Sequence, residues 1–158
     1  SEAMGLRNAL LSNIERSITC STDKERQELL NIVIVGGGAT GVEIAGVLSE
    51  MKRFVLPHDY PDMPSSLMHI YLIEAGPRLL PGMSTESSEK AEQFLREMGV
   101  NILLNKKVVD YKDHKVILED GSEIATRTFI WVSGVTAIPV GNLSPALLGR
   151  GRRIKVDD

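Results

Sequence analysis

The most constraining feature of this sequence is a glycine-rich hexapeptide between a strand-like segment and a helix-like segment. Residues 31–35 (N-I-V-I-V) are rich in β-branched side chains, as in a strand that is buried on both faces of a parallel sheet. Residues 36–41 (G-G-G-A-T-G) follow at once and satisfy the pattern G-x-G-x-x-G. From Thr40 to about Phe54 the apolar residues recur with helical spacing. This order predicts a dinucleotide-binding strand–turn–helix unit.

Each glycine of the pattern has its own physical role in such a unit. Gly36 permits the tight turn between strand and helix, and Gly38 allows a pyrophosphate to approach the backbone without meeting a Cβ atom. Gly41 lets the helix pack closely on the strand. The unpaired amides and the positive dipole at the helix N-terminus then bind the phosphates. An ordinary strand-to-helix turn is the alternative, because glycines also occur there.

The segment 69–74 (H-I-Y-L-I-E) predicts a second strand that ends in an acid, Glu74. A carboxylate at this point accepts hydrogen bonds from the ribose hydroxyls of an adenosine and repels a 2′-phosphate, which favours NAD(H) over NADP(H). Glu74 lies farther from Gly41 than the usual ~20 residues. The proline-rich residues 55–68 predict an irregular loop that accounts for the extra length. The alternative for Glu74 is a solvent-facing acid at a strand end.

Two further charged residues near this motif have open roles. Glu43, two residues after the last glycine, is either an acid favoured by the dipole at a helix start or a carboxylate at the nicotinamide end of the site. Arg78 is interpreted as a loop residue that faces solvent or the adenine, although its charge would also suit a 2′-phosphate. Spacing alone does not separate these roles.

The remaining segments predict an α/β fold. Further helices are expected over 1–20, 23–30 and 84–98, and further strands over 100–104 and 128–132. The apolar face of the first helix is expected to hold Met4, Leu11, Ile14 and Ile18, with Leu6 and Leu10 beside them. Short half-polar segments predict an antiparallel meander over 107–111, 115–118 and 122–125. The tail predicts a turn of helix at 145–148 and a strand-like end at 153–156. This order indicates one Rossmann-like doubly wound parallel sheet with a three-stranded antiparallel β-meander.

Composition and residue patterns exclude several other classes of function. The formal net charge of −3 argues against a general affinity for nucleic acid, which requires a basic face. Cys20 is the single cysteine, and no spacing suits a redox pair, a metal site or a nucleophilic triad. Neither a membrane-spanning run nor a secretory signal is evident, so we expect a cytoplasmic setting. We expect His58, His69 and His114 at the surface and Trp131 in the core.

Three stretches resemble the NADH-binding domain of type II NADH dehydrogenases, which are flavoproteins of the pyridine nucleotide-disulfide oxidoreductase superfamily. They are V-G-G-G-A-T-G-V-E-I-A-G (35–46), Y-L-I-E-A-G-P-R-L-L-P-G-M (71–83) and T-R-T-F-I-W-V-S-G-V (126–135). L-R-N-A-L-L-S-N-I-E-R (6–16) is similar to the helix that leads into this domain. The glycine-rich loop is shared across the superfamily, whereas the 6–16 helix and I-W-V-S-G-V favour the type II enzymes.

The resemblance implies a larger parent protein, in which the NADH domain is inserted within a split FAD domain. NADH then passes a hydride to FAD, and a quinone is reduced. We expect residues 1–158 to be a single NAD(H)-binding domain excised from such a parent, with a helical leading segment (1–30), a nucleotide-binding core (31–135) and a return segment toward the FAD domain (136–158). Alone, it would bind NADH without turnover and could self-associate through the exposed domain interface. The parent is expected to lie peripherally on the cytoplasmic face of a membrane.

Carried over by position, the resemblance assigns cofactor-binding residues but no catalytic residue and no metal ligand. The pyrophosphate is held by Gly36, Gly38 and Gly41 and by the amides of Ala39 and Thr40. The adenosine ribose is held by Glu74. The nicotinamide is bordered by Glu43 and by the backbone of Ser133, Gly134 and Val135. Ser133 stands where the family often has Ala, which leaves the turn intact.

Two other functions stay open from the sequence alone. The fingerprint would also suit the FAD-binding half of a flavoprotein, or a related reductase with another acceptor, because such domains use the same glycines and the same acid. A bound flavin would decide for that interpretation. A free-standing nucleotide-binding module without a redox role is the other alternative, and it predicts a surface without a large apolar patch.

Overall fold

A four-stranded parallel sheet forms the centre of the computed structural model, which describes residues 2–63, 65–134, 144–149 and 154–156. The strand order is β3-β2-β1-β7. These strands are β1 (Asn31–Val35), β2 (His69–Ile73), β3 (Val100–Leu103) and β7 (Thr128–Trp131). Each pair is parallel, with β1 paired to β2 from Asn31↔His69 to Val35↔Ile73. The carboxyl ends of all four strands therefore meet at one edge of the sheet.

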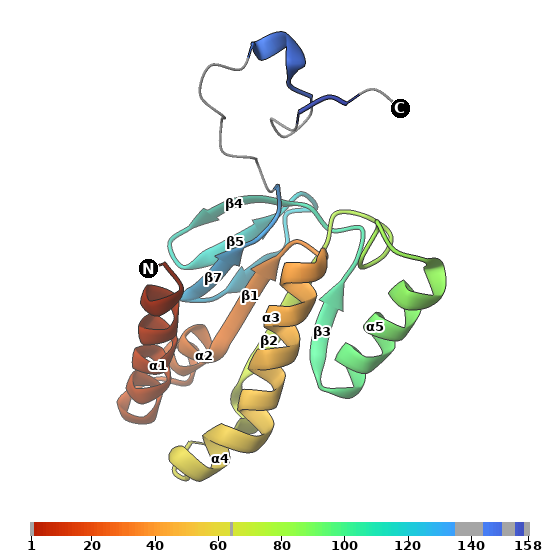
Figure 1. Ribbon diagram of the computed structural model, residues 1–158. Coiled ribbons are helices and arrows are strands. Elements are labelled where there is room, and N and C mark those ends of the chain that lie inside the picture. The colour runs from red at the N-terminus through yellow and green to blue at the C-terminus, as the bar shows by residue number, and fades with distance from the viewer. Residues whose placement is uncertain (1, 64, 135–143, 150–153, 157–158) are drawn as a thin grey trace.

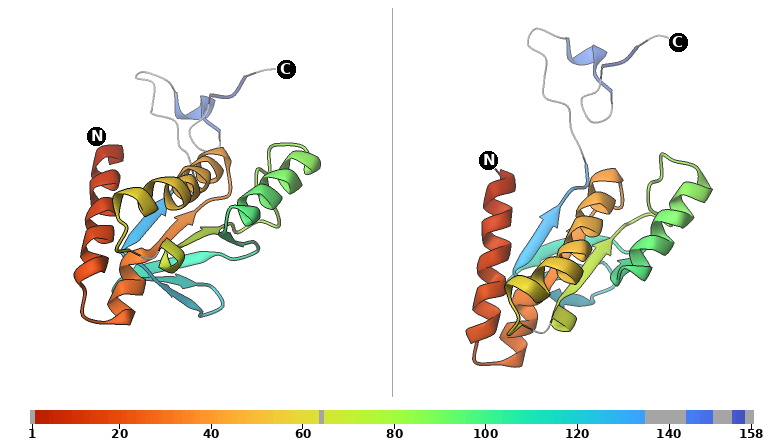
Figure 2. Two further views of the ribbon diagram at one scale, coloured as in Figure 1. Left: turned by 90° about the horizontal axis from the view of Figure 1, so that it is seen from below. Right: turned by 60° about the horizontal axis from the view of Figure 1, so that its bottom comes forward.

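Helices cover one face of the sheet (Figure 1, Figure 2). They are α1 (Glu2–Thr19), α2 (Asp23–Leu30), α3 (Ala39–Glu50), α4 (Leu56–Asp59) and α5 (Thr85–Glu97). A π-helical turn, η1 (Met51–Val55), joins α3 to α4, and a 3-10 turn, η2 (Ser65–Leu67), precedes β2. Their apolar side chains share one buried cluster with alternate residues of the sheet, among them Ile32 and Ile34. Period-two alternation along β1 thus assigns these two isoleucines to the helical layer.

A three-stranded antiparallel sheet covers the opposite face. Its strands are β4 (Val108–Lys112), β5 (Lys115–Leu118) and β6 (Glu123–Ala125), in the order β4-β5-β6. Val33 and Val35, the intervening residues of β1, pack in a second cluster with Val116 and Leu118 of this meander. The predicted α/β fold with a parallel sheet and a three-stranded meander is confirmed, and the meander rather than further helices fills the second face.

Several local predictions need correction. Residues 55–68 were expected as an irregular loop, but the chain stays helical through Asp59 because the wider π turn continues α3 into α4. Trp131, expected in the core, is 55% exposed because it lies on the last residue of an edge strand. On α1 the buried apolar residues are Leu10 and Ile14, while Met4 and Ile18 are exposed. The apolar face of α1 is therefore rotated from the expected one.

The C-terminal part is described only in two short pieces. The predicted helical turn at 145–148 is present as η3 (Pro145–Leu147), and Leu148 forms an antiparallel bridge with Ile154. Val135 lies outside the described residues. Within the described ranges, no helix combines the length and apolarity needed to cross a membrane.

Candidate functional site: the carboxyl edge of the parallel sheet

The glycine-rich loop is anchored at the carboxyl edge of the sheet by hydrogen bonds that continue the strand ladder. The Gly36 amide donates to the Ile73 carbonyl over 2.9 Å, and the Val132 amide donates to the Val35 carbonyl over 2.9 Å. The loop therefore lies between the ends of β2 and β7, where β1 passes into α3 (Figure 1). In open α/β sheets, ligands bind in the crevice outside these strand ends.

The loop is packed closely on the neighbouring backbone at two of its glycines, Gly36 and Gly41, which leaves no room there for a side chain. A Cβ atom at Gly41 would lie 1.9 Å from the Gly36 carbonyl oxygen. Gly36 has φ +118°, and a Cβ there would lie 3.0 Å from the Ser133 amide nitrogen. These contacts bring α3 close to β1 and bring the segment after β7 against the loop. The roles predicted for Gly36 and Gly41 in chain packing match this geometry.

Gly38 differs from its neighbours because it faces open space. No atom lies within 4 Å of a Cβ built on it. It is the N-cap of α3, and no side chain caps the helix. Gly38, Ala39 and Thr40 are all exposed. The first amides of an α-helix have no partner within the helix, so this end offers hydrogen-bond donors and the positive end of a dipole to an anion.

The carboxylate of Glu74 lies directly against this loop. Its Oε2 accepts a hydrogen bond from the Gly37 amide over 2.6 Å, and its Oε1 accepts one from the Gly76 amide over 2.7 Å. A Cβ at Gly37 would lie 2.9 Å from Glu74 Cβ and 2.7 Å from Leu79 Cδ2. Gly37 is therefore required so that the acid can approach. The two bonds fix the direction of the carboxylate next to the glycine-rich loop.

Gly37 and Gly76 contact the Glu74 carboxylate, and the sequence reasoning did not include them among the site residues. The signals were present: a third glycine within the turn, and a glycine two residues after the acid. Neither follows from the G-x-G-x-x-G pattern, because the pattern leaves the position of Gly37 free.

The remaining predicted site residues lie around the same edge. Glu43 is exposed and forms no hydrogen bond or ion pair with any described residue. Ser133 and Gly134 are exposed after β7, with Ser133 beside Gly36. The guanidinium of Arg78 donates to Thr85 Oγ1 over 3.1 Å and to the Pro81 carbonyl over 2.9 Å. Arg78 is thus held by its own loop.

Trp131 adds an exposed aromatic ring near the end of the site. Its indole Nε1 donates to the Ser133 carbonyl over 2.9 Å. The ring is tilted on Phe129, which itself stacks on Tyr111 with centroids 4.7 Å apart. The three rings thus form a continuous row from β4 of the meander to Trp131, whose indole contacts the turn after β7. Burial raises the pKa of Tyr111.

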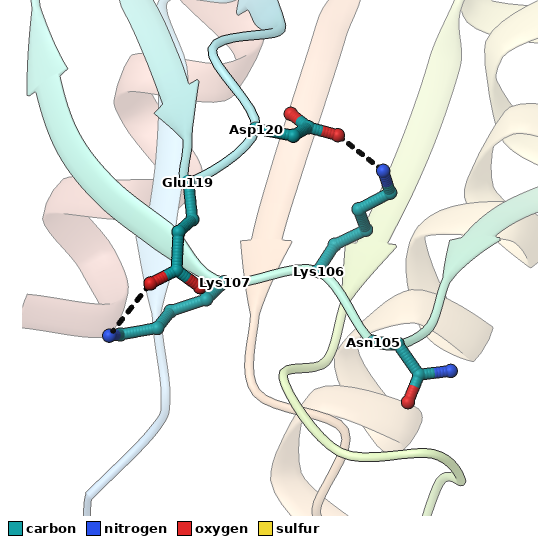
Figure 3. Close-up of a pocket in the computed structure, with 5 residues that line it drawn as sticks. All are labelled: Asn105, Lys106, Lys107, Glu119 and Asp120. Carbon is teal, nitrogen blue, oxygen red and sulfur yellow. Dashed lines mark hydrogen bonds and ion pairs between the residues drawn. The ribbon is translucent and has the colours of Figure 1, made fainter.

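A polar pocket of about 190 Å³ borders the acid end of the site (Figure 3). The Lys106 amide donates to the Glu74 carbonyl, which places the pocket next to the carboxyl end of β2. Within it, Lys106 pairs with Asp120, and Lys107 pairs with Glu119 over 3.5 Å. The hydrogen bond from Lys106 holds the pKa of Asp120 well below its usual range. Each cation of the pocket is therefore matched by an anion.

Comparison with known proteins places this arrangement in a family. The family model for pyridine nucleotide-disulphide oxidoreductases matches residues 4–158, nearly the whole chain. The chain belongs to the pyridine nucleotide-disulphide oxidoreductase family. The resemblance stated from the sequence is confirmed at this level.

Similar members of the pyridine nucleotide-disulphide oxidoreductase family include type II NADH:quinone oxidoreductases. The chain is 38% identical over 111 residues to the Haemophilus influenzae protein of that name, covering 70% of this chain and 25% of the relative. It is 34% identical over 146 residues to NdhA of Mycobacterium tuberculosis, covering 90% of this chain and 31% of the relative. The chain thus spans about a quarter to a third of these relatives.

The fold has a close counterpart among solved structures. NDH2 from Plasmodium falciparum in complex with NADH superposes with a TM-score of 0.80 at 24% identity, over 86% of this chain and 29% of that one. At this identity the likeness supports the fold alone. The two curated relatives and this structure agree in matching only part of the longer protein.

Proposed function

We propose that this chain is the NADH-binding part of a flavin-dependent NADH:quinone oxidoreductase. The observation that carries the proposal is the hydrogen bond from the Gly37 amide to the Glu74 carboxylate. It brings the acid expected to bind the ribose and the loop expected to bind the pyrophosphate together in one site. The family and the type II relatives support the nicotinamide dinucleotide as the ligand.

The residues at the loop suit a pyrophosphate. The amides of the exposed residues Ala39 and Thr40 stand at the start of α3, where a negative charge is stabilised by the helix dipole. The open space beside Gly38 is where the phosphates would lie, since no side chain fills it. Gly36 and Gly41 act on the ligand indirectly, by keeping α3 close to β1.

Glu74 suits an adenosine ribose that carries two free hydroxyls. A carboxylate has about four lone-pair positions. The amides of Gly37 and Gly76 occupy two of them and orient the group, so that others stay available to the ribose hydroxyls. A 2′-phosphate would place like charges together, and Arg78 is held away by Thr85 and Pro81. We therefore expect NADH to bind in preference to NADPH.

The nicotinamide end of the site would lie along the segment after β7. Ser133 is held against Gly36, and Gly134 follows it with φ +80°. Their exposed backbone, together with Val135 and with Glu43 on α3, would border the ring. Bound NADH would supply the hydride that a flavin accepts, and these residues would orient the ring. The flavin and the quinone site would be contributed by other parts of the whole protein.

The test measures ligand preference in a Glu74→Gln variant, with Glu89→Gln as the matched control on the exposed surface of α5. Calorimetric titrations with NADH, NADPH and FAD are run in parallel. Because hydrogen bonds to a charged group are lost, the affinity for NADH is expected to fall about 10- to 100-fold. The affinity for NADPH should change little, and the control variant should keep both affinities. Equal losses for NADH and NADPH would contradict the ribose assignment. Tighter binding of FAD than of NADH by the unmodified chain would favour a flavin-binding domain instead.

A further inference from the structure

A second pocket lies at the opposite end of the parallel sheet from the glycine-rich loop. It has a volume of about 300 Å³, and its lining residues are Ser49, Lys52, Arg53, Ser65, Ser66 and Met98. The last residues of α3, the turn before β2 and the turn before β3 meet here, at the amino ends of the strands (Figure 1). This basal pocket is therefore separate from the proposed NADH site.

The basal pocket carries two cations without matching anions. Neither Lys52 nor Arg53 forms an ion pair with a carboxylate within the described ranges, in contrast to the lysines of Figure 3. Arg53 instead stands over the Phe54 ring, 5.1 Å from its centroid. Burial lowers the pKa of Lys52, and burial together with the charge of Lys52 lowers the pKa of His69. A local excess of positive charge, partly withdrawn from water, attracts an anion.

Two features distinguish the basal pocket from an ordinary patch of solvent-exposed cations. Ser49 is 2% exposed, and its hydroxyl has no hydrogen-bond partner. A buried hydroxyl without a partner is costly, and because Ser49 is one of the residues that line the pocket, a ligand that reaches this hydroxyl and accepts its hydrogen would remove that cost. Lys52 and Arg53 also lie within the π-helical turn η1, and such turns are rare and frequent at functional sites.

We propose that the basal pocket binds a phosphate group. An ammonium, a guanidinium and the hydroxyls of three serines supply more donors than a carboxylate accepts, and they suit an oxyanion with several oxygens. A volume of about 300 Å³ is at the lower limit of small-molecule sites, so there is room for part of the molecule that carries the phosphate. That molecule is a phosphorylated metabolite or a phospholipid headgroup, and the test separates the two.

The test follows backbone amides by heteronuclear NMR while inorganic phosphate replaces chloride at constant ionic strength. We expect saturable shifts at residues 52–53 and 65–66. Lys52→Gln should weaken this binding at least tenfold, whereas Lys24→Gln, which removes an exposed lysine of α2, should leave it unchanged. Shifts at Gly38 and Ala39 report phosphate at the glycine-rich loop and should persist in Lys52→Gln. Failure at one site is thereby distinguished from failure at the other.

A second variant separates ligand binding from a structural role. Ser49→Ala removes the unpartnered hydroxyl, so without phosphate its melting temperature should equal or exceed that of the unmodified chain, while its phosphate affinity falls several-fold. Cosedimentation with phosphatidylglycerol vesicles, but not phosphatidylcholine vesicles, in a manner that needs Lys52 would identify a lipid headgroup. Phosphate binding without vesicle binding would identify a soluble ligand. The absence of saturable shifts at the pocket, or equal effects of Lys52→Gln and Lys24→Gln, would overturn the proposal.

Discussion

Gly41 is the residue where the glycine-rich loop leaves no space for even one methyl group. The Cβ of an alanine would lie 1.9 Å from the carbonyl oxygen of Gly36, and this neighbour is backbone that cannot rotate away. Gly41→Ala must therefore move α3 away from β1. We expect it to lower the free energy of unfolding by about 3 kcal/mol or more, as overpacking does in tight cores. Urea unfolding monitored by circular dichroism measures this change.

The matched control is Gly46→Ala on the same helix. A Cβ at Gly46 meets no atom within 4 Å, and replacing a glycine inside a helix with alanine stabilises it by about 0.5–1 kcal/mol. The two substitutions should thus change stability in opposite directions. If both variants lost a similar amount of unfolding free energy, the close packing at Gly41 would not be the reason that the loop requires a glycine there.

The close chain packing at two glycines was predictable from the sequence because it depends on backbone geometry. Gly36 and Gly41 are recognisable from spacing, since a strand-to-helix turn imposes the same contacts wherever it occurs. Gly37 was missed because its requirement comes from Glu74, which only the pairing of β1 with β2 brings to it. Trp131 was misplaced because hydrophobicity predicts burial without telling which strand forms the edge of the sheet.

At the scale of elements, α1 is held to the edge strand β7 by packing and by a buried hydrogen bond. Asn13 Nδ2 donates to Thr128 Oγ1 over 3.0 Å, and Ile14 is 1% exposed in the cluster beneath. Ile14→Ala should therefore lower the free energy of unfolding by about 2–5 kcal/mol. Ile18→Ala, at a position that is 40% exposed, should change it by no more than about 0.5 kcal/mol. Thermal unfolding of both variants checks the difference, and similar values would show that α1 does not contribute to the cooperative fold.

Two element-level predictions failed for physical reasons that lie outside local sequence. The sequence pattern indicated that α1 was amphipathic, but helical spacing does not tell which of its neighbouring apolar residues face the sheet, and the packed structure buries Leu10 and Ile14. Residues 55–68 were expected to be irregular because they hold three prolines, of which Pro57 lies in the part that is helical. Proline is tolerated in the first turn of a helix, and here it occupies that place in α4.

At the scale of the whole molecule, the central sheet separates two apolar clusters, and β1, which leads into the glycine-rich loop, contributes side chains to both. Ile32 and Ile34 contribute to the helical cluster, and Val33 and Val35 contribute to the meander cluster. The loop that follows Val35 is therefore supported from both faces. The burial of both faces also explains why the fold class was predictable. A parallel strand that is covered on both faces needs apolar side chains on both, and this need produces the continuous β-branched run at residues 32–35.

Because the loop is continuous with this core, NADH binding should stabilise the whole chain. A ligand at 100 times its Kd adds about 2.7 kcal/mol, or roughly 5–10 °C in Tm for a chain of this size. Gly38→Ala separates this effect from folding, since its Cβ meets no atom of the protein within 4 Å but occupies the space proposed for the pyrophosphate. Its Tm without ligand should match that of the unmodified chain, while the shift with NADH is lost. Gly82→Ala, at another open position, should keep both values. A full NADH shift in Gly38→Ala would mean that the phosphates do not lie over this loop.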